Sequence, residues 1–123
     1  MIATQPTAAV VALKAFFKIA DRWRLNRGDR ATLLGSSERS VSRWRSEAGV
    51  PDLSRDQMER LSYILGIYGG LETIFGDTEL ATQWVQRPNR DFGGRTPLDR
   101  MRAGNVGDLA FVRGYVDRWA AGC

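Results

Sequence analysis

Arginine and serine side chains are concentrated in residues 36–43, and both residue types can bind phosphates and the edges of bases. An arginine fork matches guanine O6 and N7 or a phosphate group, and a serine hydroxyl can bond to either. If the segment that starts at Glu38 is helical, Arg39 and Arg43 lie on the same side of that helix, because they are four residues apart. The sequence therefore predicts a DNA contact, and its candidate residues are Ser36, Ser37, Arg39, Ser40 and Arg43.

Residues 84–98, with the sequence WVQRPNRDFGGRTPL, have the most distinctive sequence of the chain. Pro88 ends the helix before it, because proline lacks the amide hydrogen that a helix needs. Gly93 and Gly94 allow backbone angles that other residues avoid, and a new helix starts directly after the turn. A tight turn between two helices is a favourable place for recognition. The candidate recognition residues that this turn carries are Asn89, Arg90 and Arg95.

The chain has few groups that catalyse reactions. It contains no histidine and its one cysteine is Cys123, so zinc sites of the Cys/His type and histidine acid–base catalysis are excluded. Asp91, Asp99 and Asp108 have the spacing of turns and helix caps rather than that of a catalytic pair. The glycine pair at Gly93 is not followed by the Lys-Ser/Thr of a phosphate-binding loop. We therefore expect a binding protein with no enzymatic activity, no cofactor and no metal.

The charge of the chain is unevenly divided between its two halves. Residues 1–50 carry nine lysines and arginines against four acidic residues, whereas residues 51–123 carry nine against ten. This asymmetry favours a polyanion partner for the first half, although a solvated charged face would have the same composition. No apolar run is long enough to span a bilayer and no signal-peptide pattern is present, so we expect a cytoplasmic protein without membrane contact.

Apolar residues recur at steps of three and four along the chain, which predicts an all-α fold without a sheet. Asn26 and Gly28 can adopt the left-handed conformation that ends a helix, so we expect them to end the first helix. Ser54 and Gln57 form a capping box that begins the longest helix. The predicted helices are 7–25, 29–34, 38–48, 54–75, 78–87, 97–102 and 106–121.

Residues 29–48 have the pattern of a helix-turn-helix, in which two short helices are joined at Gly35. Val41, Trp44 and Ala48 lie on the apolar face of the second helix, so Trp44 belongs to the core rather than to a base-stacking surface. A plain helical hairpin has the same spacing, and the basic first half favours the helix-turn-helix. The flanking arginines that would attract phosphates regardless of sequence are Arg22, Arg24, Arg27, Arg30 and Arg45.

Three glycines interrupt the longest predicted helix, and they permit two interpretations. Gly66, Gly69 and Gly70 either allow another helix to approach closely, including one from a second copy of the chain, or mark a kink or a break. Both interpretations are compatible with the apolar face of this helix.

We expect two domains, residues 1–53 with the helix-turn-helix and residues 54–123 with the remaining helices. The long helix at the start of the second domain would also contribute to a homodimer. In the last helix, Phe111 and Tyr115 lie on a strip beside the core-facing residues. This is more apolar surface than one face of a small domain requires, which indicates an interface.

The stretch 84–98 has the pattern W-x-x-x-P-N-x-x-F-G-G-R-T-P-L, which resembles the signature of the C-terminal domain of Xre/MbcA/ParS antitoxins. Residues 33–44 are similar to the Xre-like helix-turn-helix that precedes this domain in the family. The resemblance covers about residues 10–120. The matching residues are Trp84, Pro88, Asn89, Phe92, Gly93, Gly94, Arg95, Thr96, Pro97 and Leu98, preceded by Leu33, Leu34, Gly35, Arg39, Ser40, Val41, Arg43 and Trp44.

The resemblance implies an antitoxin that neutralises a RES-domain toxin, an enzyme that consumes NAD or transfers ADP-ribose from it. In such proteins the C-terminal domain covers the NAD cleft of the toxin, and the N-terminal domain binds the operon's promoter as a dimer. The implied partners are a RES-domain toxin, operator DNA and a second copy of the chain. A stand-alone dimeric transcriptional regulator is the alternative. The candidate toxin contacts are Asn89, Arg90, Arg95, Arg100, Arg102, Phe111, Tyr115, Arg118 and Trp119.

Other residues of the signature are expected to have a structural role. The apolar side chains of the turn would pack it against its surroundings. Arg95 has two possible roles, because a buried arginine can bind the carbonyl groups of a turn and an exposed one can reach a partner. The residues assigned to packing are Trp84, Phe92, Pro97 and Leu98.

Overall fold

Residues 7–46 and 51–122 are described by a computed structural model, which confirms the all-α prediction for these ranges. The predicted end of the third helix, at Ala48, lies outside the described residues. None of the described helices is both long and apolar enough to cross a bilayer. The elements are α1 (Ala8–Arg22), α2 (Arg27–Leu34), α3 (Glu38–Ser46), α4 (Arg55–Phe75), α5 (Thr78–Gln86), the 3₁₀ turn η1 (Arg90–Phe92), α6 (Pro97–Met101) and α7 (Val106–Ala120).

Polar residues explain where most of the helices begin. The Thr7 side chain accepts a hydrogen bond from the amide of Val10 at the start of α1. The side chains of Ser54 and Gln57 each accept a hydrogen bond from the other's backbone amide, which is the capping box predicted for α4. Such caps satisfy amides that a helix leaves without partners, and removal of one costs about 1 kcal/mol.

The first helix ends earlier than predicted. Helix α1 stops at Arg22, and Arg24 adopts the left-handed conformation with a φ of 57°, in place of Asn26 or Gly28. Leu25 is thereby buried in the core, and Asn26 caps the start of α2. The prediction was wrong because burial of Leu25 and the cap at Asn26 outweigh the cost of a left-handed arginine, about 1–2 kcal/mol.

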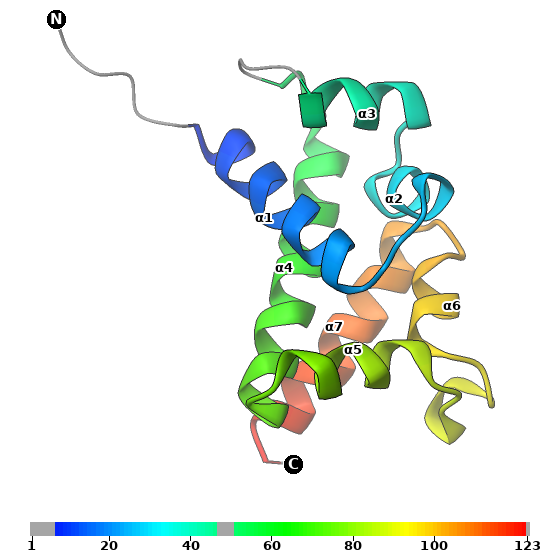
Figure 1. The fold of residues 1–123 in the computed structure, drawn as a ribbon. Coiled ribbons are helices and arrows are strands. Elements are labelled where there is room, and N and C mark those ends of the chain that lie inside the picture. Colours follow the sequence, from blue (N-terminus) through cyan, green and yellow to red (C-terminus); the bar gives the residue numbers. More distant parts are fainter. Residues whose placement is uncertain (1–6, 47–50, 123) are drawn as a thin grey trace, which may run out of the picture.

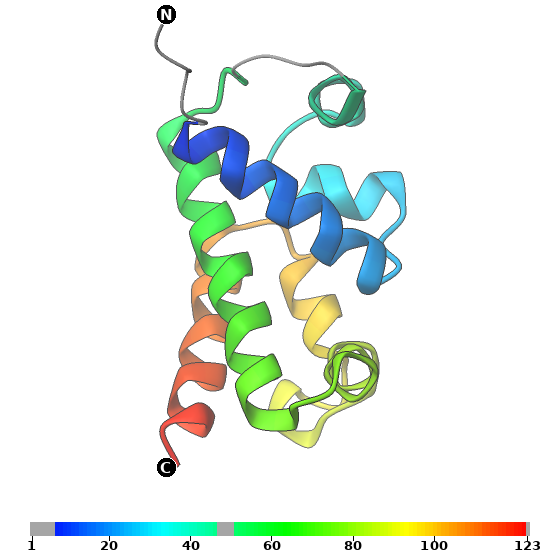
Figure 2. The same cartoon turned by 60° about the vertical axis from the view of Figure 1, so that its left-hand side comes forward.

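Helix α4 is the central element, and α7 runs alongside it in the same direction (Figure 1, Figure 2). Helix α4 is continuous, so the alternative of a break at its glycines is wrong. A Cβ atom at Gly66 would overlap the Arg113 side chain, and one at Gly70 would overlap Val116, whereas Gly69 faces open space. The close approach that the glycines permit is therefore made by α7 of the same chain.

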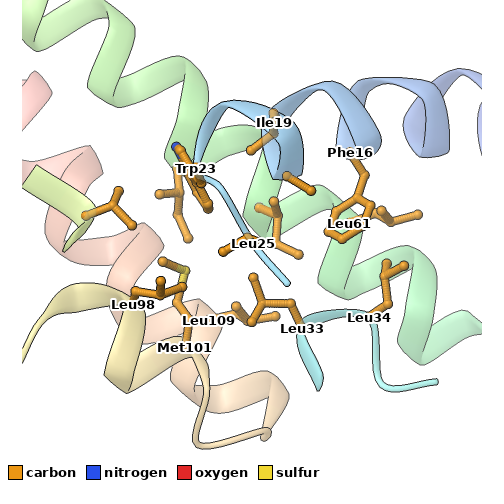
Figure 3. Packing of buried hydrophobic residues seen from close by; sticks show 14 of the residues in the cluster. Phe16, Ile19, Trp23, Leu25, Leu33, Leu34, Leu61, Leu98, Met101 and Leu109 are labelled. Atoms are coloured by element: carbon orange, nitrogen blue, oxygen red, sulfur yellow. The ribbon is translucent and has the colours of Figure 1, made fainter. Parts of the chain in front are cut away.

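One hydrophobic core extends through the whole bundle. Figure 3 shows Trp23 and Leu33 of the N-terminal part facing Leu98 and Met101 of α6, with Leu61 of α4 nearby. Four of these five side chains have no exposed surface, and Leu98 is nearly as buried. Complete burial of an apolar side chain of this size contributes about 1.5–3 kcal/mol. The shared core holds α1 and α2 in a defined position relative to α6 and α7.

Candidate functional site

Helices α2 and α3 form the two-helix unit in which the sequence predicts the DNA contacts. Gly35 ends α2 in a left-handed conformation, with a φ of 64°. Ser37 Oγ then accepts a hydrogen bond from the amide of Ser40 at 3.1 Å, which begins α3. Val41 is buried and Trp44 packs against the core, so the predicted core role of Trp44 is confirmed.

Arg39 and Arg43 are the two predicted DNA contacts that α3 presents to solvent. Both side chains are exposed, and neither makes an ion pair or hydrogen bond with a residue in 7–46 or 51–122. Ser37 and Ser40 bond to each other at the start of α3, and Ser36 is half-buried. The arginines are thus available to a ligand, whereas the serines contribute to the local structure.

The arginines that flank α3 are paired within the protein. Arg30 and Arg45 both bind Asp21, at 2.9 and 3.1 Å, and Arg27 lies 3.8 Å from Glu38. The hydrogen bond from Arg30 is the main reason that the pKa of the Asp21 carboxyl is lowered. The three arginines line a cleft of about 480 Å³ between α1, α2 and α3. Their pairing reduces the general attraction for phosphates that the sequence suggests.

Residues 88–96 form a closed turn between α5 and α6. Asn89 organises it, because its side chain accepts a hydrogen bond from the amide of Asp91 and its own amide donates to Arg95 O, both at 2.9 Å. Its carbonyl oxygen accepts two more amides of the turn. The two glycines have φ angles of 67° and 80°, which other residues rarely adopt. Asn89, a predicted toxin contact, therefore has a structural role in the turn.

Aromatic rings fix this turn to α7. The ring centroid of Phe92 lies 5.9 Å from that of Trp84 and 5.1 Å from that of Tyr115. The Trp84 ring also lies 5.6 Å from Trp119, and such ring pairs contribute about 1 kcal/mol each beyond burial. Tyr115 donates a hydrogen bond to Asp91 Oδ2 at 2.7 Å, which raises the pKa of the phenol. We name as the aromatic cluster Phe75, Trp84, Phe92, Phe111, Tyr115 and Trp119.

Two of the predicted toxin contacts are engaged in ion pairs within the chain. Arg100 donates to Asp108 at 2.8 Å, and its guanidinium carbon lies 4.0 Å from the ring centroid of Phe111. Burial alone would raise the pKa of Asp108, but hydrogen bonds from Arg100 and from the cap of α7 lower it overall. Arg102 binds Asp29 of α2 through two hydrogen bonds. Both arginines thus stabilise the fold, whatever else they contact.

Five of the predicted toxin contacts project from the surface, and we name them the presented face. The side chains of Arg90, Arg95 and Arg118 are exposed and make no hydrogen bond or ion pair with other described residues. Only the backbone of Arg95 takes part in the turn, so its side chain does not bind the carbonyl groups there. Phe111 and Trp119 are 39% and 36% exposed, unusually high values for large apolar side chains.

The sequence-based prediction did not single out Arg60, which is a buried charged residue of α4. It is 8% exposed and contacts both α2 and the connection between α6 and α7. A signal exists, because Arg60 precedes Ile64, Ile67 and Leu71 at helical spacing and so lies on the buried side of α4. In residues 7–46 and 51–122, no group of three metal-binding side chains is close enough to hold an ion.

Two family matches cover almost the whole chain. Residues 3–66 match the antitoxin Xre-like helix-turn-helix domain, and residues 70–122 match the antitoxin Xre/MbcA/ParS C-terminal toxin-binding domain. The chain belongs to the Xre/MbcA/ParS antitoxin family. It is therefore an antitoxin of a toxin–antitoxin system, and the helix-turn-helix prediction is confirmed over the plain hairpin.

Comparison with individual proteins finds a relative in sequence and a chain with a similar fold. The antitoxin is 45% identical over 111 residues to the uncharacterized protein y4oB of Sinorhizobium fredii, which covers 89% of this chain and 84% of that protein. Its fold is similar to that of a chain in the crystal structure of the M. tuberculosis MbcT–MbcA toxin–antitoxin complex. That similarity has a TM-score of 0.60 and 22% identity, and it covers 95% of this chain and 97% of the other.

Proposed function

We propose that the antitoxin binds a RES-domain toxin and closes its NAD-utilising active site, with no catalysis or cofactor of its own. The presented face is the observation that supports this proposal. Its three arginines have no partner among the described residues and accompany two exposed aromatic rings. Arginine and aromatic residues are enriched at the centres of protein interfaces, where a few side chains contribute most of the binding energy.

The base of the presented face is formed before a partner arrives. The ring contacts and the hydrogen bond from Tyr115 to Asp91 join the turn to α7 in the free chain. Little backbone conformational entropy is therefore lost when the face docks, which favours affinity. In a nucleotide cleft, Arg95 would occupy space that NAD needs and would pair with acidic or carbonyl groups of the toxin.

This function is tested by co-expressing the antitoxin with the protein encoded next to it and measuring NAD loss. We expect a stable complex in which NAD is retained, and about 10–100-fold weaker binding for Arg95→Ala or Trp119→Ala. Arg113→Ala is the matched control, since Arg113 is bound to Asp117 and to Ser62 O within the chain. Failure of the two proteins to associate, or NAD loss that continues in the complex, would contradict the proposal.

We also propose that α2 and α3 bind the operator of the antitoxin's own operon and repress it. Each of Arg39→Ala and Arg43→Ala should weaken binding to DNA by about 1–3 kcal/mol and leave toxin neutralisation intact. Fluorescence anisotropy with a duplex from the region upstream of the gene measures this affinity. Arg118→Ala is the control at the opposite end of the chain. Full affinity in both α3 variants would show that the recognition helix is wrongly assigned.

We further propose that residues 1–53 bind DNA and residues 54–123 bind the toxin, with α4 contributing to a homodimer. A dimer would place two copies of α3 against two half-sites of an operator. Helix α7 covers two glycines of α4, so the side available to a second copy includes Gly69, which faces open space. Gly69→Glu should therefore shift the molar mass in light scattering from dimer to monomer, and an unchanged dimer would contradict this role of α4.

A further inference from the structure

Helix α2 is held at its start by an arginine from the C-terminal part of the chain. Arg102 binds Asp29 with both sides of its guanidinium, Nε to Oδ1 at 2.9 Å and Nη2 to Oδ2 at 3.0 Å. The side chain of Asp29 is only 13% exposed, so the pair is partly shielded from water. Two parallel hydrogen bonds of this kind fix an orientation as well as a distance.

The end of α2 is held by Arg60, which projects from α4. Its Nη1 donates to Thr32 O in the last turn of α2 at 3.3 Å, and its Nη2 donates to Gly104 O at 3.0 Å. Its Nε bonds to Asp56 at 2.8 Å, so the buried charge is paired. The fit is close, because a Cβ atom at Gly35 would lie 2.8 Å from Arg60 Nε. One guanidinium therefore joins α2, α4 and the connection from α6 to α7.

Both contacts also match the dipole of α2, since Asp29 lies near its positive N-terminus and Arg60 meets carbonyl groups at its negative end. Helix α3 has little packing of its own. Val41 is its one fully buried side chain among the described residues, and a short turn at Gly35 links it to α2. Apart from the Arg45–Asp21 pair with α1 and the packing of Trp44, the position of α3 is thus set by the position of α2.

We propose that Arg60 and Arg102 are positioning residues for DNA binding, and that together they form a clamp on α2 that couples α3 to the toxin-binding part. This inference rests on the DNA-binding role proposed above. Arg102 and Gly104 belong to the same segment as Arg100, and both Arg100 and Arg102 are predicted toxin contacts. A toxin that displaces this segment would move α2 and, with it, α3. Coupling between two sites in one protein typically changes affinity about 5–150-fold.

The first test uses the full antitoxin alone. Arg102→Gln and Arg60→Met should each raise amide hydrogen exchange in residues 27–46 about tenfold and leave residues 84–92 unchanged. Arg118→Gln is the control and should change neither segment. If Arg60→Met does not fold, Arg102→Gln still tests the clamp, because the Arg102 side chain is 41% exposed and contributes nothing to the core. Unchanged exchange of residues 27–46 in Arg102→Gln would overturn the clamp.

The second test measures affinity for the upstream duplex, with and without the neighbouring toxin. We expect Arg102→Gln and Asp29→Asn each to weaken binding about tenfold, and the double variant to lose no more than either single one. Arg102→Lys should restore part of the affinity, since it keeps the charge but not the paired hydrogen bonds. Arg39→Ala should lower the slope of affinity against salt by about 1, whereas Arg102→Gln should keep the wild-type slope because it touches no phosphate.

Two outcomes distinguish a failure of DNA binding itself from a failure of the positioning role of Arg102. If the wild-type antitoxin does not bind the duplex with or without toxin, the DNA-binding function and the positioning role are overturned together. If the wild type binds and Arg102→Gln binds equally well with the same toxin dependence, only the positioning role is overturned.

Discussion

The two ends of the antitoxin that present arginines without partners among the described residues are built in opposite ways. Arg39 and Arg43 project from a regular helix that has one fully buried side chain, Val41. The presented face projects from an irregular turn and from α7, and the aromatic cluster joins these two segments. The regular element is thus the less anchored of the two.

This difference shows that regular secondary structure does not by itself make a recognition surface rigid. Helix α3 is regular, but in the proposed clamp its position depends on Arg60 and Arg102, which hold α2 from distant segments. The turn at residues 88–96 is irregular, yet its hydrogen bonds and ring contacts are made by its own residues and by α7. Loss of local packing should therefore affect the C-terminal end much more than α3.

Two tryptophans, Trp84 and Trp44, test this difference between the two ends with the largest expected effect. Trp84→Ala should lower the free energy of unfolding by about 3 kcal/mol, because it removes contacts with Phe92, Tyr115 and Trp119. Trp44→Ala, which removes no ring pair found in the described residues, should cost about 1 kcal/mol. Urea denaturation measures both values. Equal losses would mean that the two ends are anchored equally well.

The attachment of α7 can be tested at two neighbouring glycines. Gly70→Ala should destabilise the fold by about 2 kcal/mol, because its Cβ would overlap Val116 and push α7 away from α4. Gly69→Ala should instead stabilise it by about 0.5 kcal/mol, since it faces open space within a helix. Thermal unfolding gives both signs, and toxin binding should fall only for Gly70→Ala. A stabilising Gly70→Ala would show that the close packing of α7 is not required.

Removal of one hydrogen bond at each end of the antitoxin should cause smaller losses of stability. Tyr115→Phe removes the hydrogen bond to Asp91 and should cost about 1 kcal/mol, with weaker toxin binding and unchanged DNA binding. Ser37→Ala removes the hydrogen bond at the start of α3 and should cost a similar amount, about 1 kcal/mol, with the opposite pattern of binding. If either variant impaired both kinds of binding equally, the ends would not be separable in this way.

The pH dependence of folding stability should give the smallest of these effects. The pKa of Tyr115 is raised by its hydrogen bond to Asp91, so this contribution is complete below about pH 10 and is lost as pH rises through the higher folded value. Asp21 and Asp99 have lowered pKa values, owing chiefly to Arg30 and to the Thr96 amide. Their contribution is lost below about pH 3.9, as pH falls through the folded values.

Tryptophan fluorescence of the wild type and Tyr115→Phe, followed against pH, measures both transitions. At high pH the packing of the aromatic cluster should loosen in the wild type, and Tyr115→Phe should show no such transition. Acid loosening should be the same in the two proteins, because it depends on carboxylates at both ends of the chain. An alkaline transition of equal size in the variant would rule out the tyrosine as its cause.

Helix starts could be predicted from the sequence because they depend on nearby residues. The capping box of Ser54 and Gln57 spans one turn, and the structure contains it as predicted. The end of α1 could not be predicted in this way. Arg24 adopts its left-handed conformation because Leu25 is buried in a core formed largely by residues distant in sequence. Local propensity favours a glycine at such a position, and tertiary packing overrides it.

The residue types of the candidate site could be predicted, but not which arginines are engaged within the chain. Arg95 and Arg102 look equivalent in sequence, yet one is exposed without a partner among the described residues and the other binds Asp29 of α2. That partner is 73 residues away along the chain, so no local pattern indicates the pair. Arg60 is the intermediate case, since its register on α4 indicates burial but not its partners.

The core shared by Trp23 and Met101 has a consequence for how long the antitoxin survives in a cell. A protease that severed the chain within α4 would deprive both halves of their apolar partners, so neither fragment would persist as a folded remnant. A single cleavage would therefore abolish the proposed operator binding and the proposed toxin binding together. If the antitoxin has both functions proposed above, degradation of this protein would start transcription of the operon and release the toxin at the same time.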